Sequence, residues 1–467
     1  MEVPPIGFVI MAIVGIVAFS KPHVLIYLSA FFVPFSGTSV MNLAAFELGV
    51  VAFTFTAVVW LVSNLVQALS MRLGRVTVTL RDPVAVAMIW FLLVVALSLF
   101  MPFIIDGRDH FDGAGILGDV KTHAIRFSSW HIVHVGYVLI GVAFVLTASA
   151  VLRKKQRIES LVRWYVLGGA FAAGVGLLEV VFDLTGLSFP VYYLNTVPTT
   201  DLTGTGGRRL DGELGLLRIS SVSQEPSVFG GHLAVVFAFV WTHLTLRRRL
   251  FSKSTDIGVA LVITGALIFS LSSVAYAGLG IVVGLTALLS LSRRRGMFRM
   301  AALLGVLCIM LVAAARAVSE SEEIVNYFIL EKTQSGSFLE RATTIVNAFD
   351  LALRYPVLGV GWGLVPSFDL IVKIFVGAGL VGLFVFFRLW VSIFLALLQI
   401  RRTLRRSVIS SSTLRASGLA EGMLVGFLTL TLIYIVNGFE YRYGDFWILL
   451  TLVVAMRQRY PWTPKSP

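Results

Sequence analysis

The sequence predicts an all-α polytopic membrane protein of about 12–13 transmembrane helices, in which one large outer loop carries an amphipathic helix. The first observation is composition, because 57% of the 467 residues are hydrophobic and only 13% are charged. Soluble domains average about 25% charged residues. The second observation is a series of apolar runs long enough to span a bilayer. No change in composition marks a soluble domain, so residues 1–467 are predicted to form a single transmembrane helical domain.

Basic residues provide the third observation, because they gather between the apolar runs. The net charge is +13, and basic clusters lie at 72–81, 153–157, 247–249, 293–295, 401–406 and 457. In the predicted order of spans these clusters fall on one side of the membrane, as expected for cytoplasmic loops. This placement explains the charge better than nucleic-acid binding does. The single cysteine, Cys308, excludes a disulfide within the chain and a thiolate metal cluster.

Two short apolar runs, Ile6 to Phe19 and Val24 to Phe35, open the chain. Each is shorter than the roughly 20 residues that cross a bilayer comfortably, so they form either tilted spans or a re-entrant hairpin. The remaining predicted spans are Leu43 to Leu69, Val84 to Ile105, Trp130 to Leu152, Val162 to Leu184, Val228 to Leu246, Ile257 to Leu271, Tyr276 to Leu291, Met300 to Val318, Ile371 to Leu398, Met423 to Val436 and Phe446 to Met456.

Three polar segments are predicted to face the outside. Asp106 to Ser129 mixes acidic and basic residues, and Thr185 to Glu225 is rich in glycine, threonine and proline. The third, residues 319–366 (Ser319 to Pro366), is the large extracytoplasmic loop. These segments alternate with the basic clusters, which stay on the cytoplasmic side.

The stretch from Leu217 to His232 combines a cation, a carboxylate and a helix start at one edge of the membrane. Pro226 suits the first turn of a helix, because its fixed φ is helical and its missing N–H needs no partner there. Glu225 then stands at the cap, and the N-terminal end of the helix favours a phosphate or carboxylate. Arg218 adds a charge able to fork two phosphate oxygens. The structural alternative is that X-Pro merely starts the helix and the arginine anchors it.

The large outer loop contains an amphipathic helix with capping-box spacing from Ser337 to Glu340. Apolar residues recur at helical spacing from Phe338 to Leu353, so this helix lies on the membrane surface or over the bundle. Tyr355-Pro356 ends it. Gly359 to Gly363 is interpreted as a tight turn, because it lacks the Lys-Ser/Thr of a nucleotide loop. Arg341 either contacts a substrate or only anchors the helix at lipid headgroups.

Short motifs follow one another along the second half of the chain. They are Arg218 shortly before Glu225-Pro226-Ser227, the serine-rich Ser270 to Ser273, Ser337 to Arg341 (Ser-X-X-X-Arg), Pro356 to Gly361 (Pro-X-Leu-Gly-X-Gly) and Gly379 to Gly382 (Gly-Leu-X-Gly). None is specific alone. In this order, and on this side of the membrane, they make the chain resemble the O-antigen polymerase and O-antigen ligase family of GT-C-like bacterial membrane glycosyltransferases.

The resemblance implies an inverting glycosyl transfer, without metal or other cofactor, at the outer face of the bacterial cytoplasmic membrane. Undecaprenyl-pyrophosphate-linked oligosaccharide repeat units would be polymerised into surface polysaccharide. Ligases of the family usually carry an arginine where this chain reads Ser273 to Tyr276, and a histidine where it reads Ser367 to Asp369. These departures favour a polymerase over a ligase. The implied partners are the lipid-linked oligosaccharide, membrane lipid, a chain-length regulator and a flippase, with no nucleic acid.

The leaving group of this reaction is a lipid pyrophosphate, whose developing negative charge arginines stabilise well. The predicted catalytic residues are Arg218, Glu225 and Arg341, with Glu225 as the base for the acceptor hydroxyl. The predicted substrate-binding residues are Arg208, Arg209, His232, Asp369, Lys373 and Arg442. His232 and Asp369 are also the next candidate bases. A structural hydrogen bond at His232, and an ion pair between Asp369 and Lys373, are the simpler alternatives.

A transporter or flippase is the rival class of protein. It would carry internal repeats and ionisable residues near the bilayer midplane. This chain concentrates its charges in outer loops instead, and Glu47 and Glu179 are among the few acidic residues inside predicted spans. A glycosyltransferase therefore explains the charge distribution better.

The predicted topology can be tested with single cysteines at Thr203 and Ser335 in a Cys308→Ala background. Both positions lie in predicted outer loops, so both cysteines should react with an impermeant thiol reagent in intact spheroplasts. Protection of both until the membrane is permeabilised would place Arg218 and Arg341 in the cytoplasm and contradict the predicted site.

Overall fold

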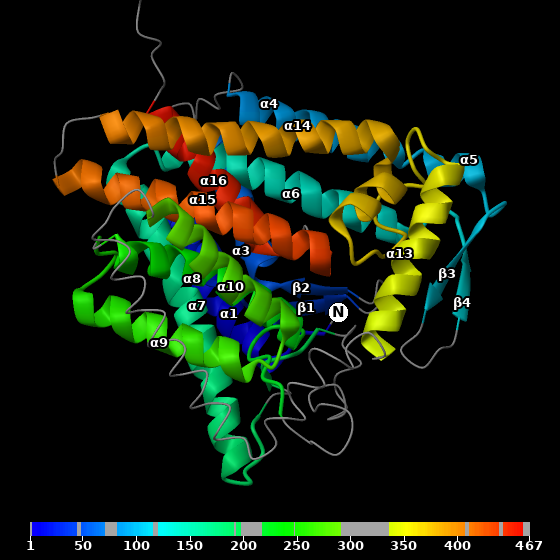
Figure 1. The fold of residues 1–467 in the computed structure, drawn as a ribbon. Coiled ribbons are helices and arrows are strands. Elements are labelled where there is room, and N and C mark those ends of the chain that lie inside the picture. The colour runs from blue at the N-terminus through cyan, green and yellow to red at the C-terminus, as the bar shows by residue number, and fades with distance from the viewer. Residues whose placement is uncertain are drawn as a thin grey trace, which may run out of the picture.

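The computed structural model describes residues 2–43, 48–70, 82–114, 120–190, 193–197, 217–246, 248–290, 336–406, 411–438 and 442–460. Figure 1 shows a bundle in which long helices run side by side. The predicted all-α polytopic membrane fold is confirmed. Within these ranges, seven helices are long and apolar enough to cross a membrane, and three shorter apolar helices accompany them. A helix occupies each predicted span except Met300 to Val318, which lies outside the described residues.

The N-terminal part contains helices joined by a small hairpin. The short apolar runs form α1 and α2, of which α2 has only seven residues and packs against α3 and α7. The elements are α1 (Pro5–Ser20), η1 (Pro22–Val24), α2 (Leu25–Phe31), β1 (Ser39–Leu43), β2 (Leu48–Val51), α3 (Ala52–Leu69), α4 (Pro83–Ser98) and α5 (Met101–Ile105).

The predicted span Leu43 to Leu69 is wrong at its start, because β1 and β2 pair antiparallel and α3 begins only at Ala52. Side chains hold the hairpin in place. The Ser39 hydroxyl and the Asn42 amide both donate to the Thr196 carbonyl, at 2.9 and 3.0 Å. These long-range bonds favour the extended backbone over helix.

A second hairpin lies in the predicted outer loop Asp106 to Ser129, where the two strands pair in register. It is followed by two long helices, the first of which has a capping box between Ser128 and His131. The elements of this part are β3 (His110–Ala114), β4 (Val120–Ala124), α6 (Ser129–Val151) and α7 (Lys155–Leu184).

The C-terminal half supplies most of the bundle. Its described elements are α8 (Pro226–Thr245), α9 (Lys253–Phe269), α10 (Ser273–Ser290), α13 (Gly336–Arg354), α14 (Leu370–Arg406), α15 (Ser411–Asn437) and α16 (Gly444–Arg459). Helix α8 begins at Pro226, as the sequence predicts.

Helix α8 is the centre of the bundle, since nearly all of its residues are buried. Small residues allow its neighbours to come close, which is how helices associate where lipid removes the hydrophobic driving force. A Cβ added to Gly230 would lie 2.5 Å from the Ala275 Cβ of α10, and one added to Gly278 of α10 would lie 2.5 Å from the Ala234 Cβ. Helix α8 therefore has little freedom to shift.

Helix α13 is the predicted amphipathic helix, and Figure 1 shows it crossing the ends of α14 and α15 rather than running beside them. It ends at Arg354, before Tyr355-Pro356, as predicted. One face of α13 is buried and another is exposed. Ala348, Leu351 and Ala352 are buried, whereas a stripe of larger apolar residues is exposed: Leu339, Val346, Phe349 and Leu353. This stripe, called the α13 apolar stripe below, is available to lipid.

Helix α14 is broken at Gly379, whose backbone (φ 66°, ψ −167°) is outside the helical region. The break is filled by the segment Pro356 to Gly361. The Leu380 N–H donates to the Pro356 carbonyl at 2.7 Å, and the Val360 N–H donates to the Val376 carbonyl at 2.8 Å. The two glycine motifs therefore lie against each other and satisfy the backbone groups that the break frees.

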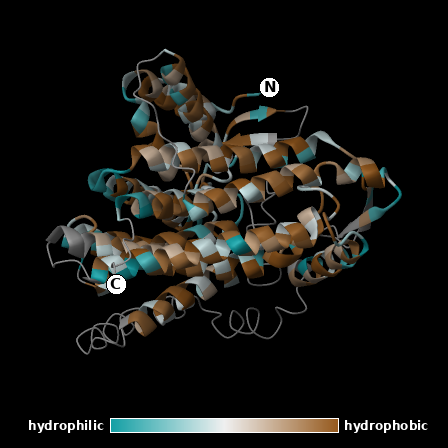
Figure 2. Ribbon diagram, turned by 90° about the horizontal axis from the view of Figure 1, so that it is seen from above, coloured by the Kyte–Doolittle hydropathy of each residue, from teal (hydrophilic) through white to brown (hydrophobic). Residues whose placement is uncertain are grey.

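Basic clusters of the described residues gather at one end of the bundle. Basic residues at 153–157, 401–406 and 457–459 lie at the C-terminal ends of α6, α14 and α16 or just beyond them. Ion pairs hold this end together, with Arg457 3.1 Å from Asp82 and Arg405 3.4 Å from the buried Glu421. Figure 2 shows hydrophobic residues along the helices and hydrophilic ones gathered toward their ends and connections.

Close packing of α7 on α2 predicts a sharp difference between two glycines of α7. A Cβ at Gly168 would lie 2.2 Å from the Phe31 carbonyl oxygen, whereas a Cβ at Gly174 meets no atom of the described chain within 4 Å. Gly168→Ala should therefore lower the melting temperature of the purified protein in detergent. Gly174→Ala should leave it unchanged or raise it, because alanine favours helix by up to about 1 kcal/mol. Equal melting temperatures would contradict this packing.

Candidate functional site

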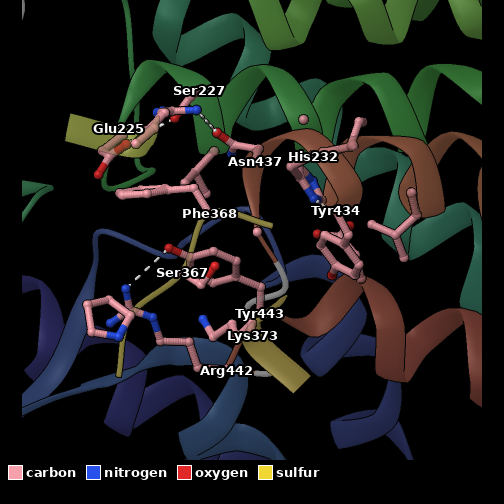
Figure 3. A pocket seen from close by; sticks show the side chains of 18 residues that line it. Glu225, Ser227, His232, Ser367, Phe368, Lys373, Tyr434, Asn437, Arg442 and Tyr443 are labelled. Carbon is pink, nitrogen blue, oxygen red and sulfur yellow. Dashed lines mark hydrogen bonds and ion pairs between the residues drawn. The ribbon is translucent and has the colours of Figure 1, made fainter. Parts of the chain in front are cut away.

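A cavity of about 230 Å³ lies at the end of the bundle opposite the basic clusters. Here the N-terminal ends of α8, α14 and α16 meet the C-terminal end of α15, and α13 closes one side. Figure 3 shows Glu225 and Ser227 on one side, Lys373 and Arg442 on another, and His232 beside Tyr434. The charged or titratable groups in the wall include Glu225, His232, Arg341, Lys373, Arg442 and Asp445.

Five of the predicted site residues are thus brought together from four different parts of the chain. They are Glu225, His232, Arg341, Lys373 and Arg442. Arg208 and Arg209 lie outside the described residues. The remaining two, Arg218 and Asp369, are placed elsewhere, as described below.

The segment before α8 is held by its serines, which fixes where Glu225 stands. The Ser221 hydroxyl donates to the Ala172 carbonyl of α7, and the Ser223 hydroxyl donates to the Pro34 carbonyl, both at 2.7 Å. The Val222 carbonyl accepts the Gly37 N–H at 3.0 Å. These bonds position the chain so that α8 starts at the cavity.

Glu225 is the N-cap residue of α8, but its carboxylate does not cap the helix backbone. It is exposed, and its Oε2 accepts the Ser227 hydroxyl at 3.0 Å. It also interacts electrostatically with Arg341. The carboxylate is therefore directed into the site rather than used to begin the helix.

Arg341 reaches the cavity from α13 and is held on two sides. One terminal nitrogen donates to the Asn437 side-chain oxygen at 2.7 Å, and the guanidinium lies 4.9 Å from the centre of the Phe368 ring. Burial lowers the pKa of Arg341, while Glu225 and Glu340 raise it. An arginine nevertheless stays protonated at physiological pH. Arg341 is therefore a fixed, partly buried cation.

Arg442 and Lys373 supply further positive charge. A terminal nitrogen of Arg442 donates to the Gln224 side-chain oxygen at 2.9 Å, and the Tyr443 hydroxyl donates to the same oxygen at 3.3 Å. Gln224 directly precedes Glu225, so Arg442 ties the start of α8 to the turn before α16. Lys373 lies in the first turn of α14.

A buried polar cluster forms the wall around His232. The His232 Nδ1 lies 2.7 Å from Asp445 Oδ1, and the Tyr165 hydroxyl of α7 donates to the same oxygen. His232 is 5% exposed, Asp445 is 6% exposed and Tyr165 is fully buried. Tyr434 of α15 is buried next to this cluster.

Arg218 is not among the residues that line the cavity, which departs from its predicted catalytic role. It interacts electrostatically with Tyr276 of α10. Two residues later the Ser220 N–H donates to the buried Glu179 carboxylate at 3.3 Å. The segment 218–220 thus contacts α7 and α10, and the residues that line the cavity begin only at Glu225.

Asp369 acts as the N-cap of α14 instead of lining the cavity. Its Oδ1 accepts the Val372 N–H at 2.8 Å, which is the usual capping bond to the third helical residue. The carboxylate is used by the helix end. The observed contact of Asp369 is therefore structural, and its predicted substrate-binding role stays a prediction.

Sequence reasoning missed most of the partners that complete the site. Asp445 is one of three charges, with Glu440 and Arg442, that the sequence crowds into a short predicted outer turn, where they line the acceptor path or pair with one another, but Tyr165 and Asn437 lie in apolar helices without a local signal. Gln224 stands beside the predicted carboxylate and is 8% exposed. Its role follows only from the bond to Arg442.

No protein-family model matches the chain, and no curated protein matches it in sequence. The chemistry of the cavity is therefore the basis for a functional argument. Three cations and three helix N-termini converge there, an arrangement that favours an anion. The volume is below the roughly 300–1,000 Å³ of sites that enclose a whole small ligand, so the cavity fits part of a larger molecule.

This geometry predicts that inorganic pyrophosphate stabilises the protein through Arg341. At about 100 times its Kd a ligand stabilises the folded state by about 2.7 kcal/mol, which a thermal-unfolding measurement in detergent detects. Arg341→Gln should abolish most of this stabilisation. Arg354→Gln is the matched control, because Arg354 lies on the same helix but pairs with Asp109 and Asp350. Equal loss in both variants would mean that pyrophosphate binds elsewhere.

Proposed function

We propose that the protein is a membrane glycosyltransferase that polymerises oligosaccharide units carried on undecaprenyl pyrophosphate. The observation that carries this proposal is the cavity in which Arg341, Lys373 and Arg442 face Glu225 and His232. The first three can hold a pyrophosphate, and the other two can accept a proton from a sugar hydroxyl. Both requirements of glycosyl transfer from a lipid pyrophosphate are met by side chains of one cavity.

The cations explain how the sugar–phosphate bond is broken. As this bond breaks, negative charge develops on the pyrophosphate, and fixed cations stabilise it more in the transition state than in the bound substrate. Arg341 is suited to this because Asn437 and Phe368 already hold its guanidinium in place. Every 1.4 kcal/mol or so of stabilisation raises the rate about tenfold.

The position of the cavity supports a lipid-linked donor. It opens at the end of the bundle opposite the basic clusters that the structure describes, and the positive-inside rule assigns that end to the outside. The α13 apolar stripe, which includes Val346 and Leu353, is exposed on the helix that carries Arg341. A helix with this pattern lies in the headgroup region, where the pyrophosphate of a lipid carrier is also found.

A polymerase is favoured over a ligase by what occupies the cavity wall. Where ligases of the resembled family carry a histidine, this chain has Ser367 and Phe368, both of which line the cavity. Phe368 supports Arg341 from below its guanidinium plane and cannot exchange a proton. The proton-accepting groups come instead from α8.

Reconstitution tests the proposed function directly. The purified protein in vesicles is given its lipid-linked repeat unit alone, and the products are separated by length. A polymerase makes a ladder of lengths from this single substrate, because each product is again a substrate. Release of single units, or transfer only after another acceptor is added, would contradict polymerisation.

Arg341→Lys should abolish most ladder formation although the charge is kept. Lysine lacks the planar fork that binds two phosphate oxygens while also contacting Asn437. The same substitution at the exposed Arg354, on the same helix, should have little effect. Ladder formation by both variants is measured at equal protein level. A normal ladder from Arg341→Lys would rule out a bidentate role.

A further inference from the structure

Only one of the two ring nitrogens of His232 makes a hydrogen bond within the described part of the chain. Its Nδ1 bonds Asp445, whereas its Nε2 is buried and has no hydrogen-bond partner within the described part of the chain. A buried polar atom without a partner is costly, and a catalytic role is one reason for such an atom to be retained. Because His232 lines the cavity, a hydroxyl of a bound ligand is the group that would form a hydrogen bond with this Nε2 atom.

The neighbours of His232 determine which nitrogen carries the proton. Asp445 Oδ1 accepts the Tyr165 hydroxyl, and it lies in the first turn of α16, where the helix dipole favours a carboxylate. Next to a carboxylate oxygen the Nδ1 of His232 must be the donor. In the neutral imidazole the lone pair is then on Nε2.

We propose that His232 is the base of the reaction, with Asp445 and Tyr165 as positioning residues. This assignment rests on the proposed function. The acceptor hydroxyl gives its proton to Nε2, its oxygen forms the new bond to the anomeric carbon, and the bond from that carbon to the pyrophosphate breaks. The electron pair leaves with the lipid pyrophosphate, which the cations hold. The imidazolium that forms is stabilised by Asp445 and then releases its proton to water.

Glu225 is less suited to this role, although the sequence favours it. Its carboxylate is exposed, accepts the Ser227 hydroxyl and faces Arg341. These two interactions already engage the carboxylate, which leaves it less available to an acceptor hydroxyl. Imidazoles as a class also exchange protons closer to neutral pH than carboxylates do. Glu225 instead helps to hold Arg341 in the cavity.

Replacement of His232 by glutamine tests the assignment in the full-length protein. His232→Gln should lower kcat by about a hundredfold or more while the KM for the lipid-linked donor stays near its wild-type value. Stabilisation by pyrophosphate should persist, because the cations are unchanged. The control is His243→Gln, since His243 is buried in the same helix and bonds the Phe239 carbonyl away from the cavity. Its kcat should stay close to the wild-type value.

A second experiment separates catalysis from structure. In His232→Ala, added imidazole should restore part of the rate, whereas it should not restore the rate of Arg341→Lys. Asp445→Asn should also lower kcat, and the double variant His232→Gln/Asp445→Asn should be no slower than His232→Gln, because the two residues act as a unit. If the losses in kcat from the two single variants multiply in the double variant, the positioning role of Asp445 is overturned.

The outcomes distinguish this inference from the proposed function. Normal turnover by His232→Gln at matched protein level, with an active wild-type protein, would overturn the assignment of the base and leave the glycosyltransferase proposal standing. If imidazole restores the rate of Arg341→Lys as much as it restores the rate of His232→Ala, the assignment of the base is also overturned. A wild-type protein that transfers no glycan would overturn the proposed function, and the role of His232 with it.

Discussion

The buried carboxylate of Asp445 is the constraint on which the rest of the structure depends. It joins three helices, because it belongs to α16, bonds His232 of α8 and accepts the Tyr165 hydroxyl of α7. A buried charge is tolerated only when its partners are in place, and losing one partner typically costs about 3–5 kcal/mol. The central helix α8 is therefore fixed in depth and rotation relative to α7 and α16. That fixed position determines which side chains of α8 reach the cavity.

The loops at the cavity end are held in place by hydrogen bonds from serine side chains and from the backbone. The segment before α8 is held to Pro34 and Ala172 by serine hydroxyls, and the segment after α13 fills the break of α14 at Gly379. Because the groups that line the cavity come from such distant parts of the chain, loose loops would leave them far apart. Ser221, Ser223 and the glycine motifs Pro356 to Gly361 and Gly379 to Gly382 are explained by these hydrogen bonds and need no direct contact with substrate.

Much of the fold could be predicted from the sequence, because helices and caps are local. The start of α8 at Pro226, the end of α13 and five of the cavity residues follow from apolar runs, turn residues and the side of the membrane. Contacts between distant residues could not be predicted in this way. His232 and Asp445 are 213 residues apart, and the hairpin before α3 depends on Thr196. Which face of α13 is buried could likewise not be predicted, since it depends on the elements packed against this helix.

The small volume of the cavity limits how much of a bound molecule the protein can contact there. A volume of about 230 Å³ is too small to enclose a long saccharide. If the proposed function holds, the sugars already joined lie outside the walls, and the side chains meet the same groups whether the product is short or long. The cavity therefore cannot distinguish short products from long ones. The distribution of product lengths would be governed by how often a product dissociates between transfers or by a separate protein.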